Sequence, residues 1–298
     1  KDPASSGSPG SSGNHGRASR IAGLSLVEEL MNFKKLSRAA ACVLIALLPA
    51  SSHAWSDAVY RLVIRKAIDT LPKAQKKFFE DHRYEMPSLT PDEDPPVRPD
   101  GRRFALDLVG VFPFVDVPQD EAAAKAKADP RRVGRLPFLL LEAHGRLVEA
   151  FKSGDKERIL QEADAVAILA ADLNNPLALA ENFDGQKTEQ PGLQKRFSSQ
   201  LAETMEGRLK LNPEAARLLE NPRDYTFGAM VRNHVWVDNI LYADRLAYRG
   251  KSSYGGAYFE ALELRSGRLL GEILSNAAAD VGSFWYTAWT EAGRPALR

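Results

Sequence analysis

The sequence is poor in cysteine and histidine, the side chains that cross-link small proteins and most often hold zinc. Its single cysteine, Cys42, lies inside the apolar run of residues 39–50, so no disulfide can form within the chain. A domain without disulfides must be held together by packing alone. Only three of its five histidines follow position 54. They are His82, His144 and His234; none has a partner at a convincing chelate spacing, and we interpret them as ordinary core or surface residues.

Neither positive nor negative charge is concentrated in any one part of the sequence. Removing the 6 basic and 3 acidic residues of positions 1–54 from the chain's 40 and 39 leaves a net charge of −2 for residues 55–298. The pair Arg102-Arg103 and the isolated Lys251 are too sparse for a nucleic-acid-binding stripe. The composition therefore gives no indication of polyanion binding, and the residues identify no partner.

The first 54 residues differ in character from the rest. Residues 1–20 are rich in Gly, Ser and Pro, and we expect residues 1–30 to be disordered or an upstream segment. Residues 31–54 combine a basic opening, an apolar run and a small-residue end, Ser52-His53-Ala54, which is typical of a cleaved secretory signal. The alternative is a short buried helix. The run is shorter than the roughly 20 residues that span a bilayer, so we expect a secreted or periplasmic domain, 55–298, without a transmembrane helix.

Helical periodicity dominates residues 55–298, and alternating strand patterns are missing. We therefore predict an all-α domain. Five prolines exclude a helix or central strand over residues 85–101. Gly154-Asp155 predicts a break between two helices, and the aromatic residues near positions 242 and 284–289 are interpreted as core. Helices are expected at 57–71, 137–153, 156–173, 192–210, 213–220, 224–249 and 255–292.

Four segments follow one another between residues 54 and 295: A-W-S-D-A-V-Y-R-L-V-I-R-K-A-I, G-R-L-P-F…L-V-E-A-F-K-S-G-D, A-D-L-N-N-P-L-A-L-A-E-N-F-D-G-Q-K-T-E-Q-P-G-L-Q-K-R-F and F-W-Y-T-A-W-T-E-A-G-R-P. Together they resemble the zinc-dependent phospholipase C and single-strand-specific nuclease superfamily. The resemblance implies one all-helical domain. In active members of that superfamily, three zinc ions are held by a Trp N-terminus, several histidines and a few carboxylates.

Most of the zinc ligands that the resemblance implies are replaced. Three matches persist: Trp55, Asp92 and Asp172. Five histidine positions and one glutamate position carry other residues, in order Tyr60, Arg103, Ile168, Ala178, Gln194 and, for the glutamate, Ser198. Structural zinc binding contributes roughly 10–16 kcal/mol in small domains, and losing five imidazoles removes most of its source. We therefore expect no metal cofactor.

Asp172 has two interpretations. It is either a surviving ligand or an acid that is hydrogen-bonded to a neighbouring loop or paired with Arg103, and we favour the second. A carboxylate near a helix C-terminus opposes the helix dipole at a cost of about 0.3–1 kcal/mol. A salt bridge from Arg103 to Asp92 or Asp172 would replace the metal inside the old site, provided that hydrogen bonds offset its desolvation.

Two functions follow from this pattern. The first is an exported, non-catalytic pseudoenzyme that has lost its zinc cluster and serves a binding or scaffolding role. The second is a hydrolase of phosphodiester bonds, in phospholipid or nucleic acid, that uses Asp92, Asp172 and the Trp55 amine on one metal ion. The residues favour the pseudoenzyme.

Overall fold

The computed structural model describes residues 54–89, 101–205 and 207–297, and these residues form helices without any β-strand. The predicted all-α class is confirmed. Contacts divide the chain after Ser52, and all described residues belong to the second unit. The segment 1–30, the signal residues up to position 53 and Asp92 lie outside the described residues. No described helix is both long and apolar enough to cross a membrane.

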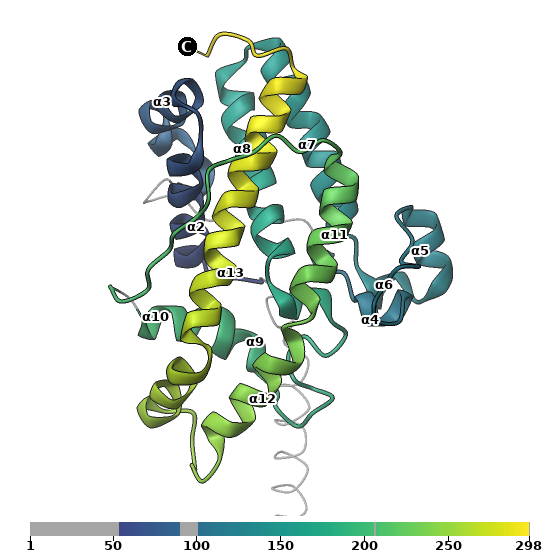
Figure 1. Ribbon diagram of the computed structural model, residues 1–298, viewed down its shortest axis with the longest axis vertical. Helices are drawn as coiled ribbons and strands as arrows, with labels where there is room; N and C mark the ends of the chain where they lie inside the picture. The colour runs from purple at the N-terminus through teal and green to yellow at the C-terminus, as the bar shows by residue number, and fades with distance from the viewer. Residues whose placement is uncertain (1–53, 90–100, 206, 298) are drawn as a thin grey trace, which may run out of the picture. The chain divides into compact units, whose positions relative to one another are not determined.

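The helices vary widely in length (Figure 1). The longer α-helices are α2 (Asp57–Thr70), α3 (Lys73–Asp81), α7 (Leu136–Ser153), α8 (Lys156–Leu173), α11 (Pro222–His234), α12 (Val237–Tyr248) and α13 (Gly256–Glu291). The shorter ones are α4 (Leu106–Val109), α5 (Glu121–Lys127), α6 (Pro130–Val133), α9 (Leu193–Lys195) and α10 (Ala202–Thr204). The remaining turns are η1 (Arg83–Glu85), η2 (Pro87–Leu89), η3 (Pro176–Leu179) and the π-helical η4 (Arg196–Leu201).

Two residues set the connection between α7 and α8. Gly154 ends α7 in the left-handed conformation, with φ of 69°, and its N–H donates to the Ala150 carbonyl at 3.2 Å. Asp155 caps α8, and its carboxylate accepts from the Arg158 N–H at 3.1 Å. Glycine and aspartate suit these two positions. The predicted break is therefore confirmed.

Helix α13 is the longest helix among the described residues and packs against several of the other long helices. It contacts α2, α7, α8 and α12 (Figure 1). The Trp285 ring stacks on Phe79 of α3, with 4.4 Å between ring centroids. Close approach to α2 depends on a missing side chain, because a Cβ added at Gly282 would lie 2.0 Å from Thr70 Oγ1. Helix α13 thus carries a large aromatic residue where it faces α3 and a glycine where it faces α2.

Residues 207–221, here called the strap, cross α13 in an extended conformation on their way to α11 (Figure 1). The helix predicted for 213–220 is therefore wrong. Hydroxyl side chains of α13 accept from backbone N–H groups of the strap at 3.0–3.1 Å: Ser275 from Asn212, Ser283 from Arg217 and Thr287 from Leu219. These hydroxyls accept hydrogen bonds from N–H groups of the strap that would donate to backbone carbonyls if the strap were a helix.

Other predicted elements need smaller corrections. The helix expected at 192–210 ends at Thr204, and the one expected at 224–249 divides into α11 and α12. Helices α4, α5 and α6 were not predicted. Tyr242 was expected in the core but is 64% exposed, because the buried face of α12 is formed by Ile240, Ala243 and Ala247.

The contact at Gly282 gives a paired test of the packing. Gly282→Ala should lower the free energy of unfolding by about 1–3 kcal/mol, since the added methyl overlaps Thr70. Gly145→Ala, inside α7 with no atom within 4 Å of the new Cβ, should instead raise it by about 0.5–1 kcal/mol. Urea unfolding measures both. Adding Thr70→Ala to Gly282→Ala should recover part of the loss, and no recovery would contradict the proposed contact.

Candidate functional site

Asp172 is fully buried in the last turn of α8 and lies at the centre of a polar network. The Tyr60 hydroxyl, from the first turn of α2, donates to Asp172 Oδ1. Arg102 Nη1 lies 2.7 Å from Asp172 Oδ2 and also donates to the Tyr60 hydroxyl at 3.2 Å. No member of this trio is more than 4% exposed. The carboxylate therefore contacts a hydroxyl and a guanidinium in a water-excluded setting.

The charge of Arg102 is maintained inside the network. Burial acts to lower the pKa of Arg102, but the neighbouring Asp172 carboxylate and the Tyr60 oxygen outweigh that effect and raise the pKa above its usual value. Arginine is suited to this position because its guanidinium stays charged when partly desolvated. The network is thus a buried ion pair supported by a hydroxyl.

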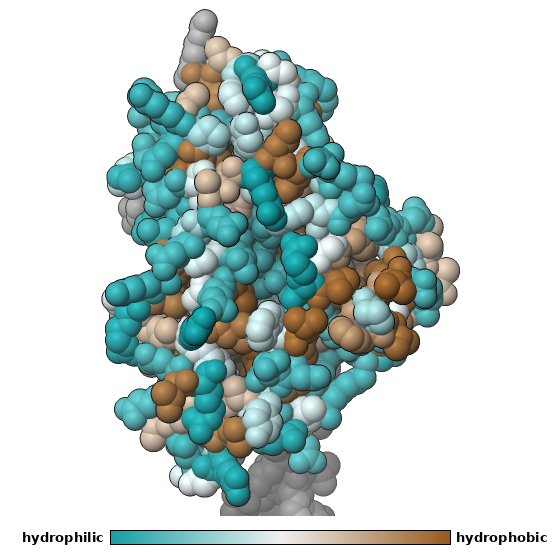
Figure 2. Space-filling model, viewed as in Figure 1, coloured by the Kyte–Doolittle hydropathy of each residue, from teal (hydrophilic) through white to brown (hydrophobic). Residues whose placement is uncertain are grey.

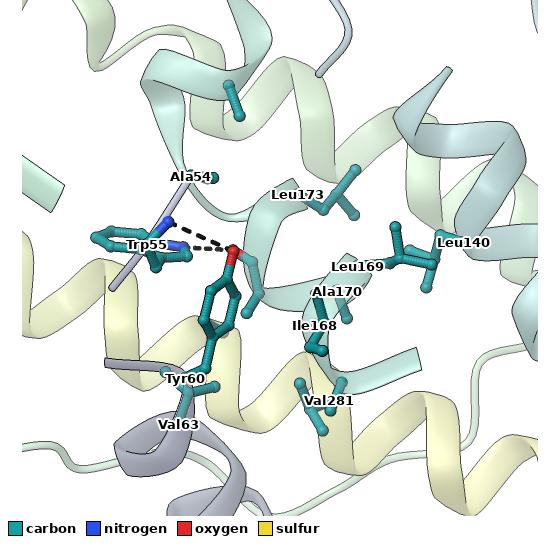
Figure 3. Packing of buried hydrophobic residues seen from close by; sticks show 14 of the residues in the cluster. Ala54, Trp55, Tyr60, Val63, Leu140, Ile168, Leu169, Ala170, Leu173 and Val281 are labelled. Carbon is teal, nitrogen blue, oxygen red and sulfur yellow. Dashed lines mark hydrogen bonds between the residues drawn. The ribbon is translucent and has the colours of Figure 1, made fainter. Parts of the chain in front are cut away.

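Trp55 and Ser198 join the same region through backbone and amide contacts. The Trp55 backbone N–H lies 3.4 Å from the Tyr60 hydroxyl, and its indole donates to the Ala171 carbonyl at 2.9 Å (Figure 3). The Asn175 side chain donates to the Ala54 carbonyl at 2.6 Å and to Ser198 Oγ at 2.9 Å. Positions far apart in the sequence, which the resemblance implies for one metal cluster, do lie together.

The local backbone explains why Arg102 enters the network. Residues 101–105 run extended against residues 133–136, with hydrogen bonds from Arg135 N to the Gly101 carbonyl and from Leu136 N to the Arg103 carbonyl at 2.8 and 3.1 Å. Side chains alternate in direction along extended backbone. Arg102 therefore points toward Asp172 and Arg103 points away.

The predicted pairing of Arg103 with Asp172 is wrong. The Arg103 guanidinium lies 3.7 Å from the centroid of the Phe183 ring, and burial lowers the pKa of Arg103. Its other proposed partner, Asp92, lies outside the described residues. A cation does pair with Asp172, but it belongs to the preceding residue, Arg102. The alternation of side chains in an extended segment indicates that only one of the two adjacent arginines turns inward, but it does not say which one.

Three other positions that the resemblance assigns to metal ligands are also buried. Ile168 lies one turn before Asp172 on α8, and Figure 3 shows it among apolar side chains of α8 and α13. Ala178 is fully buried, and its carbonyl accepts from the Phe104 N–H at 2.8 Å. Gln194 is 8% exposed, and its backbone N–H donates to Asp184 at 3.0 Å. Ile168 and Ala178 thus place buried apolar side chains at two positions that the resemblance assigns to metal ligands.

The three described histidines lie in different environments, and His144 Nδ1 and His234 Nε2 are buried without a hydrogen-bond partner among the described residues. His82 follows the end of α3 and contacts Glu85 at 2.8 Å. His144 is buried in α7, where burial lowers its pKa against the opposing effect of Glu291, 3.0 Å away. Burial also lowers the pKa of His234. Among the described residues, no three His, Cys, Asp or Glu side chains are grouped to hold a metal ion.

The donor chemistry around Asp172 fits an ion pair and does not fit the zinc cluster that the resemblance implies. A zinc ion needs deprotonated or neutral donors around it, whereas Arg102 places a fixed cation 2.7 Å from the carboxylate. Ile168 and Ala178 offer no donor atom.

Comparisons with known proteins add no family: no protein-family model matches the chain, and no curated protein matches it.

Removing Arg102 should test the ion pair. Arg102→Met leaves Asp172 buried beside a neutral side chain, so we expect a loss of about 3–5 kcal/mol in the free energy of unfolding. The double variant Arg102→Met/Asp172→Leu should lose less than the single variant, because it removes both charges of the pair. Arg103→Met should cost about 0.5–2 kcal/mol, the contribution of a cation–π contact. Urea denaturation that ranks Arg103→Met at or above Arg102→Met would contradict the assignment.

Proposed function

We propose that residues 55–298 form a helical domain of the zinc phospholipase C and nuclease type whose metal site has been replaced by the Arg102–Asp172–Tyr60 network. In this proposal the protein is exported, is not a catalyst, and serves by binding or scaffolding. The observation that carries the proposal is the buried guanidinium 2.7 Å from Asp172. It supports the loss of catalysis because a permanent cation repels the dication that the chemistry requires.

The replaced positions support the same proposal through packing. Former ligand positions Ile168 and Ala178 now belong to the apolar core. Burial of apolar surface contributes about 25 cal/mol per Å² to folding. The domain therefore has a source of stability at this site that does not depend on a bound metal.

Export through a cleaved signal is part of the proposal and agrees with the position of Trp55. Cleavage before Trp55 would turn its backbone N–H, 3.4 Å from the Tyr60 hydroxyl, into an ammonium group. That ammonium group would lie beside the Tyr60 hydroxyl, which already donates to Asp172. A second cation would then reinforce the network in place of a metal.

The second candidate is a phosphodiester hydrolase with a reduced site. The observation that favours it is the closeness of the Trp55 nitrogen to the Tyr60–Asp172 hydrogen bond, since both Trp55 and Asp172 match ligand positions of the family. Its third ligand would be Asp92. The two candidates differ in metal content and in activity.

Metal content and activity, measured on one sample starting at Trp55, separate the candidates. We expect no stoichiometric zinc by elemental analysis, no hydrolysis of bis(p-nitrophenyl) phosphate above background, and an unchanged thermal midpoint after EDTA. The reduced-site hydrolase predicts bound metal and activity that Asp172→Asn abolishes while the protein stays folded. That result would replace the proposed function.

Restoring the ligands tests the role of Arg102 directly. The restoration variant carries Tyr60→His, Arg103→His, Ile168→His, Ala178→His, Gln194→His and Ser198→Glu. A companion variant carries the same changes with Arg102→Gln. We expect the companion to bind zinc at least about tenfold more tightly, since two unit charges 4 Å apart interact by about 4 kcal/mol at an effective dielectric constant of 20. Equal zinc affinities by competition titration would show that Arg102 does not block the site.

A further inference from the structure

A cavity of about 230 Å³ lies between α11, α13 and the strap, and no member of the Arg102–Asp172–Tyr60 network lines it. One water takes roughly 30 Å³ in the liquid, so the cavity has room for a small ligand. The three elements are neighbours in Figure 1, and polar side chains cover the strip between α11 and α13 in Figure 2. A ligand here would meet mainly polar and charged groups.

The inner wall of the cavity is formed by Asp280, which is 7% exposed. The Tyr225 hydroxyl donates to Asp280 Oδ1, and Asn174 Nδ2 donates to Asp280 Oδ2 at 2.9 Å. Burial, together with the Asp280 carboxylate, raises the pKa of Tyr225 to about 12, so its hydroxyl stays protonated at neutral pH. Both Asp280 oxygens are therefore bound by neutral donors from the protein.

Two arginines flank the same tyrosine at this cavity. The guanidinium carbons of Arg217 and Arg232 lie 5.3 and 5.1 Å from the centroid of the Tyr225 ring. Arg217 Nη2 also donates to the Tyr225 hydroxyl at 3.2 Å. Within the described part of the chain, no carboxylate lies within ion-pair distance of either guanidinium. Two planar cations with donors to spare match the geometry of an oxyanion.

Two residues at the rim of the cavity add a negative charge and an aromatic ring. Glu214, on the strap, lines the cavity and acts electrostatically on Arg217. Trp236, which follows α11, lines it too and is 38% exposed. A half-exposed indole can contact an apolar or planar group attached to a bound anion. The cavity thus combines two arginine side chains with a partly exposed aromatic ring at its rim.

We propose that this cavity binds a phosphate group, held by Arg217 and Arg232, either as free phosphate or as a monoester whose organic part contacts Trp236. The proposal goes beyond the function proposed for the domain, because it assigns a ligand class at a site that shares no residue with the former metal positions. Glu214 limits the affinity, since its carboxylate would face the anion.

Calorimetric titration of the purified 55–298 domain with inorganic phosphate and with phenyl phosphate, at low ionic strength, tests the proposal. We expect one site, with Arg217→Gln and Arg232→Gln each weakening binding about tenfold, the effect of losing a hydrogen bond to a charged group. Glu214→Gln should strengthen binding about threefold, the effect of removing an exposed like charge. A purely structural role for Glu214 would not produce a gain.

Arg249→Gln is the matched control, since Arg249 is exposed after α12 and does not line the cavity. It should leave the affinity unchanged, and circular dichroism should show every variant folded. Tighter binding of phenyl phosphate, with the advantage lost in Trp236→Ala, identifies a monoester; equal binding identifies free phosphate. No binding of either probe, or equal weakening by Arg249→Gln and the two cavity variants, would overturn the proposal.

Discussion

The buried C-terminus of α8 is the constraint on which the centre of the molecule depends. The last carbonyls of a helix have no partner inside it and must find donors elsewhere. Here donors are supplied from within the protein at 2.9–3.1 Å: Asn174 Nδ2 to Ala170, Trp55 Nε1 to Ala171, Asn175 N to Asp172 and Asn233 Nδ2 to Leu173. The helix end also carries the negative pole of the dipole, and Asp172 adds a full negative charge. A buried cation is needed there, and Arg102 supplies it.

Two of these donors and the Arg102 cation come from segments that are distant from α8 in sequence, so satisfying one helix end brings these segments together. Trp55 precedes α2, Arg102 belongs to the extended segment beside residues 133–136, and Asn233 belongs to α11. A metal cluster could connect the same segments through its ligands. An ion pair does so without a cofactor, at the cost of desolvating two charges. The hydrogen bond that Tyr60 donates to Asp172 helps to offset that cost.

The sequence predicts those features that short-range chemistry controls. Gly154-Asp155 fixes the break between α7 and α8 because left-handed backbone and an N-cap each favour a particular residue. The strap and Arg102 could not be found in this way. Residues 213–220 are compatible with a helix locally, and they stay extended because hydroxyls of α13 accept from their backbone. Which of two adjacent arginines turns inward depends on the register of residues 101–105 against 133–136, which no local pattern specifies.

Asp172 and Asp280 are both buried near the end of α8, but their negative charges are compensated in different ways. This difference separates a structural site from the proposed binding site. Asp172 contacts a guanidinium as well as a hydroxyl, so its charge is neutralised within the protein. Among the described residues, Asp280 receives side-chain hydrogen bonds from the neutral groups of Tyr225 and Asn174, and burial raises its pKa. Asn174 donates both to Asp280 and to the α8 carbonyl of Ala170, so the cavity wall is tied to the same helix end. Asp280 acts electrostatically on Arg217 and Arg232, but among the described residues neither guanidinium forms an ion pair with it, so both keep hydrogen-bond donors for an anion from solution.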